Sequence, residues 1–520
     1  MVTPYGIKIA VHLVTNHFGN LVAKVCECLF SHGPLRLDQL VRYTELTKEQ
    51  VKNSLLVLIQ HNCVQAFVSG PQDDDDEAGK LRVRTQYLVL FGNILHRLRF
   101  PKFLDIVSRK FNNECVEILD GLLRDGRLTL KQMVDRASQG NEDAVAANVI
   151  REGLCKLLTA RYVERCPAPE PVVSTVFKDE TSTRKRSSKA AKIFEAPQTI
   201  ELRVLDAAVR GEAIRFSFTA DMGCNADGEA NSDDIEMTYI GENAAKEEEI
   251  LWRANFEEFI RHLRHKVLIE NVRTKHDDGT ATVLSAILEA TITTEKKVKM
   301  ENSVPLSLDT IITEVMKTET GRTMTIDRIR ASLDQDRLGC SQKMIIDDAY
   351  SIDLKKIIER ARNEEVDSIV LKRYGASAHR VFRLLSKDDN CFQDTDQIAA
   401  KTLVDKKEVP KLLCKLWKDN YLHMEKVLVP GPKLSSNILM WKVNKALLWE
   451  CVLDEMYHAA LNLSLRMAFE YEKDEEVVNA PKDKLQEPLL KRYKRLMNVW
   501  LFLGSSMMKL DDTLMLFHDF

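Results

Sequence analysis

The stretch LVRYTELTKEQVKNSLLVLIQHNCV, residues 40–64, decides the fold. Its second half places Val51, Leu55 and Leu58 at helical spacing, which predicts a helix with one buried face. A shorter amphipathic helix precedes it, across a tight polar turn. Two short helices joined in this way form a helix-turn-helix. We therefore expect the inner face of the second helix to be core and its outer face to be a contact surface.

The same pattern returns near the other end of the chain. The stretch IAAKTLVDKKEVPKLLCKLWKDNYL, residues 398–422, aligns with residues 40–64 without a gap, so that Asn62 falls on Asn420. A capping-box pattern precedes the second helix in both copies, formed by Thr47 with Gln50 and by Asp405 with Glu408. Because the turn and the helix ends match as well as the apolar positions, we interpret the unit as an internal repeat.

Looser copies of the unit lie between these two. One spans residues 121–165, with a longer turn, and a weaker candidate spans residues 305–333. Strand-prone sequence follows the second helix in the first and last copies, as in CVQAFVSG (63–70) and YLHMEKVLVP (421–430). Two short strands behind a helix-turn-helix form a winged helix. The chain is thus predicted to be mainly α with small β wings, built from four tandem winged-helix domains.

The C-terminal end carries a different signal. Its apolar residues follow each other at intervals of four and three, which is the a/d pattern of a left-handed coiled coil. An earlier amphipathic stretch, residues 448–463, is separated from it by NAPKDKLQEP (479–488), so we expect a coiled-coil helical hairpin. The candidate subunit-interface residues are Leu489, Tyr493, Leu496, Trp500, Leu503, Met507, Leu510 and Leu514.

The outer face of the second helix in the last copy is a candidate DNA surface. Lysines form a stripe there, opposite an apolar face that we expect to include Leu416 and Trp417. The candidate DNA-proximal residues are Lys407, Lys411, Lys415 and Lys418, with Lys433 in the following wing loop. Lysine stripes are more often solvated faces, and that alternative stays open. No set of side chains resembles a base-reading constellation, so DNA contacts would lack sequence specificity.

Two charged segments are expected to lie outside the domain cores. The first wing has an acidic tip, Asp73–Glu77, which argues against that wing approaching phosphate. Residues 168–247 are rich in Pro, Ser, Gly and charge, which predicts a flexible linker or insertion. Within it, RKRSSK (184–189) is either a nuclear-localisation or phosphorylation segment, or a basic run of the kind that is common in linkers.

Composition limits the classes of function. With 75 Lys+Arg against 78 Asp+Glu, the chain lacks the net basic charge that non-specific DNA coating requires. Eleven cysteines without a CxxC pair favour reduced thiols, and His262 and His265, without a third ligand, are expected to be surface residues. The motifs GxxxxGK[ST], GxGxxG, HExxH and GxSxG are absent. We therefore expect no catalytic residue, no cofactor and no metal.

No signal peptide and no apolar run of membrane-spanning length is recognisable, so we expect an intracellular protein with no membrane partner. The patterns divide the chain into six expected segments. They are winged helix 1 (1–100), winged helix 2 (101–167), the charged linker (168–247), winged helix 3 (248–358), winged helix 4 (359–444) and the coiled-coil hairpin (445–520).

Several stretches carry a family resemblance, in chain order: NHFGNLVAKVCECLFSHGPLRLDQLV, HRLRFPKF, LLRDGRLTL, YVERCP, LWRANFEEFIRHLRH and HRVFRLL. Together they resemble the third subunit of eukaryotic RNA polymerase III, across nearly the whole chain. The resemblance implies four extended winged helices and a C-terminal coiled-coil hairpin. It also implies a non-catalytic nuclear subunit that forms a heterotrimer with two smaller polymerase III subunits, similar to general transcription factor IIE.

In that family the heterotrimer sits on the clamp of the large subunit and supports promoter opening and initiation. The resemblance thus implies transcription of tRNA, 5S ribosomal RNA and other small RNA genes, with single- or double-stranded promoter DNA as a partner. Two other classes stay open: a scaffold subunit of a lid-type complex, in which helical repeats end in one winged helix, and a free DNA-binding regulator. The repeat at both ends favours the polymerase subunit, and the near-neutral charge counts against the regulator.

Overall fold

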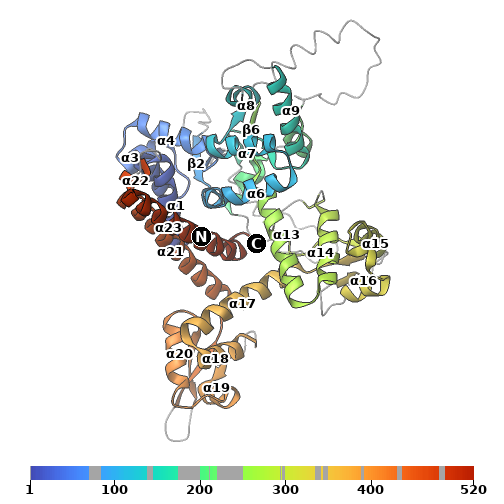
Figure 1. The fold of residues 1–520 in the computed structure, drawn as a ribbon. Helices are drawn as coiled ribbons and strands as arrows, with labels where there is room; N and C mark the ends of the chain where they lie inside the picture. The colour runs from blue at the N-terminus through green and yellow to red at the C-terminus, as the bar shows by residue number, and fades with distance from the viewer. Residues whose placement is uncertain are drawn as a thin grey trace, which may run out of the picture. The chain divides into compact units, whose positions relative to one another are not determined.

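The computed structural model is mainly helical, with four three-stranded sheets in the part of the chain that it describes (Figure 1). The described residues are 2–69, 84–137, 144–173, 199–209, 211–218, 250–292, 294–295, 299–333, 341–343, 349–387, 392–429, 436–479 and 487–520. They form two compact units, an N-terminal unit of Val2 and Ile7–Phe259 and a C-terminal unit of Thr3–Gly6 and Ile260–Phe520. None of the helices in these ranges combines the length and the apolar character that a membrane span requires.

Up to residue 254 the elements in chain order are α1 (Pro4–Phe18), α2 (Asn20–His32), α3 (Leu37–Thr44), α4 (Lys48–Gln60), β1 (Val64–Ser69), β2 (Arg84–Val89), α5 (Phe91–Leu95), η1 (His96–Arg99), α6 (Phe100–Lys110), α7 (Asn113–Asp125), β3 (Leu128–Thr129), α8 (Leu130–Ala137), α9 (Ala144–Thr159), β4 (Val163–Arg165), β5 (Val172–Val173), α10 (Ile200–Ala208), α11 (Glu212–Arg215) and β6 (Leu251–Ala254).

The remaining elements are α13 (Phe256–Lys275), α14 (Asp278–Thr291), β7 (Leu306–Ser307), α15 (Leu308–Lys317), η2 (Gly321–Thr323), α16 (Ile326–Ser332), β8 (Ser341–Lys343), β9 (Ala349–Ser351), α17 (Leu354–Tyr374), α18 (Ala376–Lys387), β10 (Gln393–Asp394), α19 (Thr395–Thr402), α20 (Val409–Lys418), β11 (His423–Val429), β12 (Ser436–Lys442), α21 (Lys445–Lys473), α22 (Glu475–Asn479) and α23 (Glu487–His518).

Helix α4 has the start and the buried face that the sequence predicts. The hydroxyl of Thr47 accepts a hydrogen bond from the Gln50 amide at 3.3 Å, and the Gln50 side chain accepts one from the Thr47 amide at 3.0 Å. This reciprocal pair satisfies two amides that a helix start otherwise leaves unbonded. Val51 and Leu58 are fully buried, which confirms the predicted apolar face.

The end of the second helix is the feature that repeats most faithfully in three of the copies. Helices α4, α9 and α20 are followed by one residue in the left-handed region: Asn62 (φ 59°), Arg161 (φ 62°) and Asn420 (φ 63°). The next amide then donates to the carbonyl oxygen five residues earlier, at 2.8–2.9 Å, from Cys63 to Leu58, from Tyr162 to Leu157 and from Tyr421 to Leu416. This is the Schellman motif. The shared motif confirms that the aligned stretches adopt one local structure.

Strands follow the repeated helices as predicted at both ends of the chain. β1 and β2 pair antiparallel from Val64↔Val89 to Ser69↔Arg84, and β11 and β12 pair from His423↔Lys442 to Val429↔Ser436. The strand orders are β2-β1-β5, β3-β6-β4, β7-β9-β8 and β10-β12-β11. The acidic tip of the first wing, Asp73–Glu77, lies outside the described residues, as does RKRSSK (184–189).

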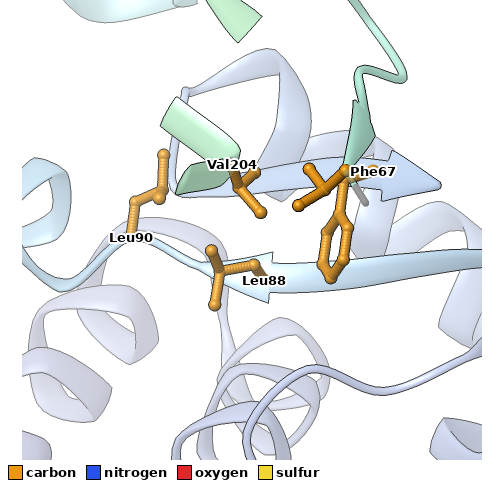
Figure 2. Packing of buried hydrophobic residues seen from close by; sticks show 5 residues of the cluster. Phe67, Leu88, Leu90 and Val204 are labelled. Carbon is orange, nitrogen blue, oxygen red and sulfur yellow. The ribbon is translucent and has the colours of Figure 1, made fainter. Parts of the chain in front are cut away.

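Part of the predicted flexible linker, residues 168–247, is ordered on the first wing. Strand β5 pairs in parallel with β1, through Val68↔Val172, and helix α10 packs on the same sheet. Figure 2 shows the result: Val204 of α10 points into the apolar cluster formed with Phe67, Leu88, Leu90 and Val173. Burial of each such side chain contributes about 1.5–3 kcal/mol. The prediction of a flexible linker is wrong for β5 and α10, because both bury apolar residues against a preformed sheet.

Strand β6 corrects a predicted domain boundary. It lies between β3 and β4, so residues 251–254 complete the sheet of the second repeat and do not begin winged helix 3 at residue 248. Its Trp252 is 1% exposed. Helix α11 supports the same sheet, because Arg215 forms ion pairs with the buried Glu164 of β4 and with Glu257. The long insertion therefore separates two neighbouring strands of one wing.

A close backbone approach joins the first and second repeats. The Gln60 side chain donates hydrogen bonds to the backbone oxygens of Asp125 (3.0 Å) and Arg127 (2.5 Å), and Arg127 Nε donates to Asn62 Oδ1 at 2.9 Å. Gly126 lies between them with φ +85°, and a Cβ atom built there would be 2.1 Å from the Gln60 carbonyl oxygen. Only glycine fits this position, because both its backbone angle and its surroundings exclude a side chain.

We predict that Gly126→Ala destabilises the N-terminal unit more than Gly375→Ala destabilises the C-terminal unit. Gly375 has the same φ of +85°, but a Cβ atom built there would meet no atom within 4 Å, so its substitution adds only backbone strain of about 1–3 kcal/mol. Gly126→Ala adds a collision with the backbone. Thermal unfolding, with hydrogen exchange to locate the loosened region, measures the difference; equal losses would contradict a tight junction at Gly126.

A half-buried basic cluster lies beside this junction. The Arg97 guanidinium is 4.6 Å from the centre of the Phe18 ring and 5.3 Å from that of Phe100, and the His61 ring is 4.6 Å from that of Phe18. Burial lowers the pKa of both His17 and His61 to about 4, and the charge of Arg97 adds to the effect. Both imidazoles are therefore neutral in the folded protein at neutral pH.

The depressed pKa values predict acid sensitivity. The folded state takes up fewer protons than the unfolded state below pH 6.5, so the stabilisation is complete above that pH and is lost as the pH falls toward 4. His61→Phe keeps a ring against Phe18 but removes one titrating group. Its melting temperature should fall less over this pH range than that of the wild type. The control His423→Phe, at an exposed site, should follow the wild-type profile; identical profiles for all three proteins would refute the assignment.

Candidate nucleic-acid and subunit interfaces

Helix α20 presents three lysines of the predicted stripe to solvent. Its core side buries Val409, Leu413 and Leu416, which are all 0% exposed. Lys411 and Lys418 lie on the opposite, exposed side, and no described carboxylate pairs with either of them. Lys407, in the turn before the helix, is likewise exposed and without an ion pair in the described ranges. Lys433 lies outside the described residues.

Lys415 is held differently from the other lysines. Its Nζ is 5.3 Å from the centre of the Tyr374 ring in α17. The Tyr374 hydroxyl donates to the Asp419 carboxylate, and burial raises the pKa of this phenol to about 12, so the ring stays neutral at physiological pH. A cation over an aromatic face is stabilised within the protein. Lys415 is thus less available to a phosphate than Lys411 or Lys418.

The start of α20 departs from the predicted capping box. Asp405 Oδ1 accepts a hydrogen bond from the Lys407 amide at 3.1 Å, and α20 begins at Val409, with Pro410 in its first turn. The predicted bond to the Glu408 amide is replaced by a turn, in which the Glu408 and Val409 amides both donate to the Asp405 carbonyl. A carboxylate therefore occupies the N-terminal end of α20, so that phosphate binding would depend on the lysine side chains.

Two exposed apolar residues in this copy of the helix-turn-helix were not expected. Trp417 was predicted on the buried face but is 45% exposed, and Leu403, in the left-handed turn residue that matches Glu45, is 86% exposed. Trp417 lies eight residues after Val409, which corresponds to about 80° around the helix from the centre of the core face. This angle places Trp417 at the edge of the core face and predicts its exposure. Grouping Trp417 with its sequence neighbour Leu416 hid that difference.

The predicted interface residues of the C-terminal helix are buried or half-buried. α21 and α23 pack against each other in antiparallel directions, as shown by the Asp474–Arg492 ion pair near one end and the neighbouring rings of Tyr457 and His518 near the other. Among the predicted residues, Leu496, Met507 and Leu514 are buried. Leu489, Tyr493, Trp500, Leu503 and Leu510 are half-buried.

Trp500 packs within the seam against an aromatic residue of the same chain. Its ring stacks on Tyr471 of α21, with 5.7 Å between ring centres and 19° between ring planes. The predicted seam therefore has an internal role in the hairpin. The exposed apolar residues of α23 are different ones, namely Leu490, Met497, Leu501 and Phe502.

One of the two histidines that were expected at the surface, His265, belongs to a buried charge cluster. His265 is 7% exposed, and its Nε2 lies 3.5 Å from the carboxylate of the buried Glu295, which Arg261 also approaches at 3.4 Å. The prediction for His265 is wrong because its side of α13 faces this carboxylate; His262 is half-buried. Within the described ranges, no group of three His, Cys, Asp or Glu side chains is arranged to hold a metal ion.

Comparison with known families matches three parts of the chain. The RNA polymerase III subunit RPC82 helix-turn-helix domain matches residues 8–69, RNA polymerase III subunit RPC82 matches residues 152–343, and the POLR3C C-terminal winged-helix domain matches residues 366–436. The first and last matches contain the two aligned helix-turn-helix units. The chain belongs to the RNA polymerase III subunit RPC82 family.

Individual members of the family extend the similarity. DNA-directed RNA polymerase III subunit RPC3 of Homo sapiens is 22% identical over 496 residues, which cover 92% of this chain and 86% of that protein. The protein of the same name from Danio rerio is 22% identical over 486 residues, with the same coverage. That of Dictyostelium discoideum is 30% identical over 206 residues, or 36% of this chain and 30% of its own length.

For this RPC82-family chain we predict that Lys411→Glu with Lys418→Glu weakens DNA binding. Each lost phosphate contact should reduce the slope of log K against log salt concentration by about 0.9 on duplex DNA, so the double variant should lose up to about 1.8. Fluorescence anisotropy with a short labelled duplex, over a salt series, measures this slope. The matched control changes the exposed Lys356 and Lys372 of α17 to Glu. An unchanged slope would identify the stripe as a solvated face.

Proposed function

We propose that the chain is a non-catalytic subunit of RNA polymerase III. Its family membership and its coverage of 92% by subunits named RPC3 carry this proposal. In this role it forms a heterotrimer with two smaller winged-helix subunits on the clamp of the large subunit. The assembly supports promoter opening and initiation at genes for tRNA, 5S ribosomal RNA and other small RNAs, in the nucleus.

The proposed architecture is four extended winged helices followed by a coiled-coil hairpin. Support comes from the four three-stranded sheets and from the Schellman motif that ends α4, α9 and α20. The third copy has the same order of elements, α15, α16, β8 and β9, with β7 completing its sheet. The hairpin seam of α21 and α23 holds two long helices together. Rigid modules of this kind suit a subunit that positions other molecules.

In this proposal, promoter DNA passes the outer face of α20 without sequence-specific contacts. Lys407, Lys411 and Lys418 supply cations for phosphates of single- or double-stranded DNA, and Lys415 assists from its position over Tyr374. The exposed indole of Trp417 lies on the same helix. Phosphate contacts of this kind fix position and orientation but do not read sequence. The near-neutral charge of the chain makes the surrounding polymerase the main source of DNA affinity.

A scaffold subunit of a lid-type complex is the other candidate. Such a scaffold would carry a single winged helix at its end. The repeat at residues 40–64, with the same helix end as residues 398–422, favours the polymerase subunit, as do the three family matches.

Co-purification tests the proposal directly. The tagged chain is recovered from nuclear extract after nuclease treatment, and its companions are identified by mass spectrometry, with an untagged extract as control. We expect the large subunits of polymerase III and two small winged-helix proteins in near-equal amounts. Recovery of a lid-type complex, or of no stable companion, would overturn the proposed function.

A further inference from the structure

A groove opens beside the seam of the hairpin, and Leu503 of the seam forms part of its wall. It has a volume of about 510 Å³ and is lined by Arg466 of α21 and by Arg495, Asn498, Val499, Phe502 and Leu503 of α23. Phe502 is 72% exposed. Phe469 lies next to this lining, since the Arg466 guanidinium is 5.3 Å from its ring centre, and the ring is 52% exposed. Single exposed apolar residues are common, but aromatic rings gathered at a groove mark a binding surface.

The cations around this groove are arranged in a row. Lys491, Arg495, Asn498 and Phe502 are spaced by four, three and four residues, which places them along one exposed face of α23. No described carboxylate pairs with Lys491 or Arg495. Arg466, by contrast, pairs with the buried Glu470 and is held in place at the groove wall. Arg495 therefore lines the groove as a cation without a described carboxylate partner, and Lys491 lies about one helical turn before it.

The surroundings favour a protein over a nucleic acid as the occupant. The end of α21 and the start of α22 carry Glu472, Glu475 and Glu476, all exposed, which would repel a polyphosphate backbone. Val499 and Leu503 give the groove aliphatic walls, which suit apolar side chains better than flat bases. A segment with a few carboxylates and one or two large apolar residues matches both the cations and the walls.

We propose that this groove binds an acidic amphipathic segment of another subunit of the polymerase, an inference that rests on the proposed function. An apolar side chain of the segment packs between Phe469 and Phe502, and its carboxylates pair with Arg495 and Lys491. The buried Glu470 pairs with Arg466, so this side chain of the groove needs little further ordering on binding.

Site-specific photo-cross-linking tests this contact in the assembled enzyme. Phe502 is replaced by p-benzoylphenylalanine, which keeps an aromatic side chain, in the tagged full-length chain. The purified polymerase is irradiated, and the cross-linked peptide is identified by mass spectrometry. We expect a segment of another subunit with net negative charge and an apolar residue at the cross-link. Adding Arg495→Glu should reduce the yield on the order of tenfold, and the exchange of a carboxylate for arginine in that segment should restore it.

The control Lys494→Glu makes the same charge change on the adjacent residue, about 100° away around α23, and should leave the yield unchanged. Equal effects of the two variants would overturn the proposal, as would cross-links confined to this chain or to nucleic acid. If polymerase subunits are recovered but Phe502 captures none of them, only the groove proposal fails. If no polymerase subunit is recovered, the proposed function fails and this inference fails with it.

Discussion

One residue in the left-handed region, placed after α4, α9 and α20, determines where the wing that follows each of these helices begins. At Asn62, Arg161 and Asn420 the chain reverses direction, and the next residue, Cys63, Tyr162 or Tyr421, is buried at 0–3% exposure. A non-glycine residue pays about 1–2 kcal/mol for this conformation. The two backbone hydrogen bonds of the Schellman motif and the burial of the next side chain offset that cost. This turn sets the orientation of the strands relative to the outer face of the helix.

Local patterns could be predicted from the sequence because they depend on residues within a few turns of each other. Thr47 and Gln50 define the start of α4, and the spacing of Val51, Leu55 and Leu58 defines its buried side. The intervals of four and three in the C-terminal helix likewise identify the side that packs against α21. For the candidate site, this reasoning finds the exposed lysines of α20.

Contacts between distant residues could not be predicted in the same way. Nothing in the sequence around Val172 or Val204 shows that these residues complete the first wing, because the pairing depends on a sheet formed about a hundred residues earlier. Lys415 belongs to the same stripe as Lys411 and Lys418, yet its Nζ lies over the Tyr374 ring of α17, which makes it less available to a phosphate. Phe502 has no periodic signal because it lies outside the seam. In each case a partner from elsewhere in the fold decides the role of the side chain.

The placement of the long insertion has a consequence for how this chain can change. The polypeptide leaves the second sheet at Arg165 and re-enters it at Leu251, and Arg165 pairs directly with Trp252. Paired strands lie about 4.8 Å apart, so the two ends of the insertion are nearly adjacent. Sequence can therefore be gained or lost between them without shifting the register of β4 against β6. We expect this segment to accept the insertion of a fluorescent reporter or an additional domain, provided that β5 and α10, which pack on the first wing, are kept.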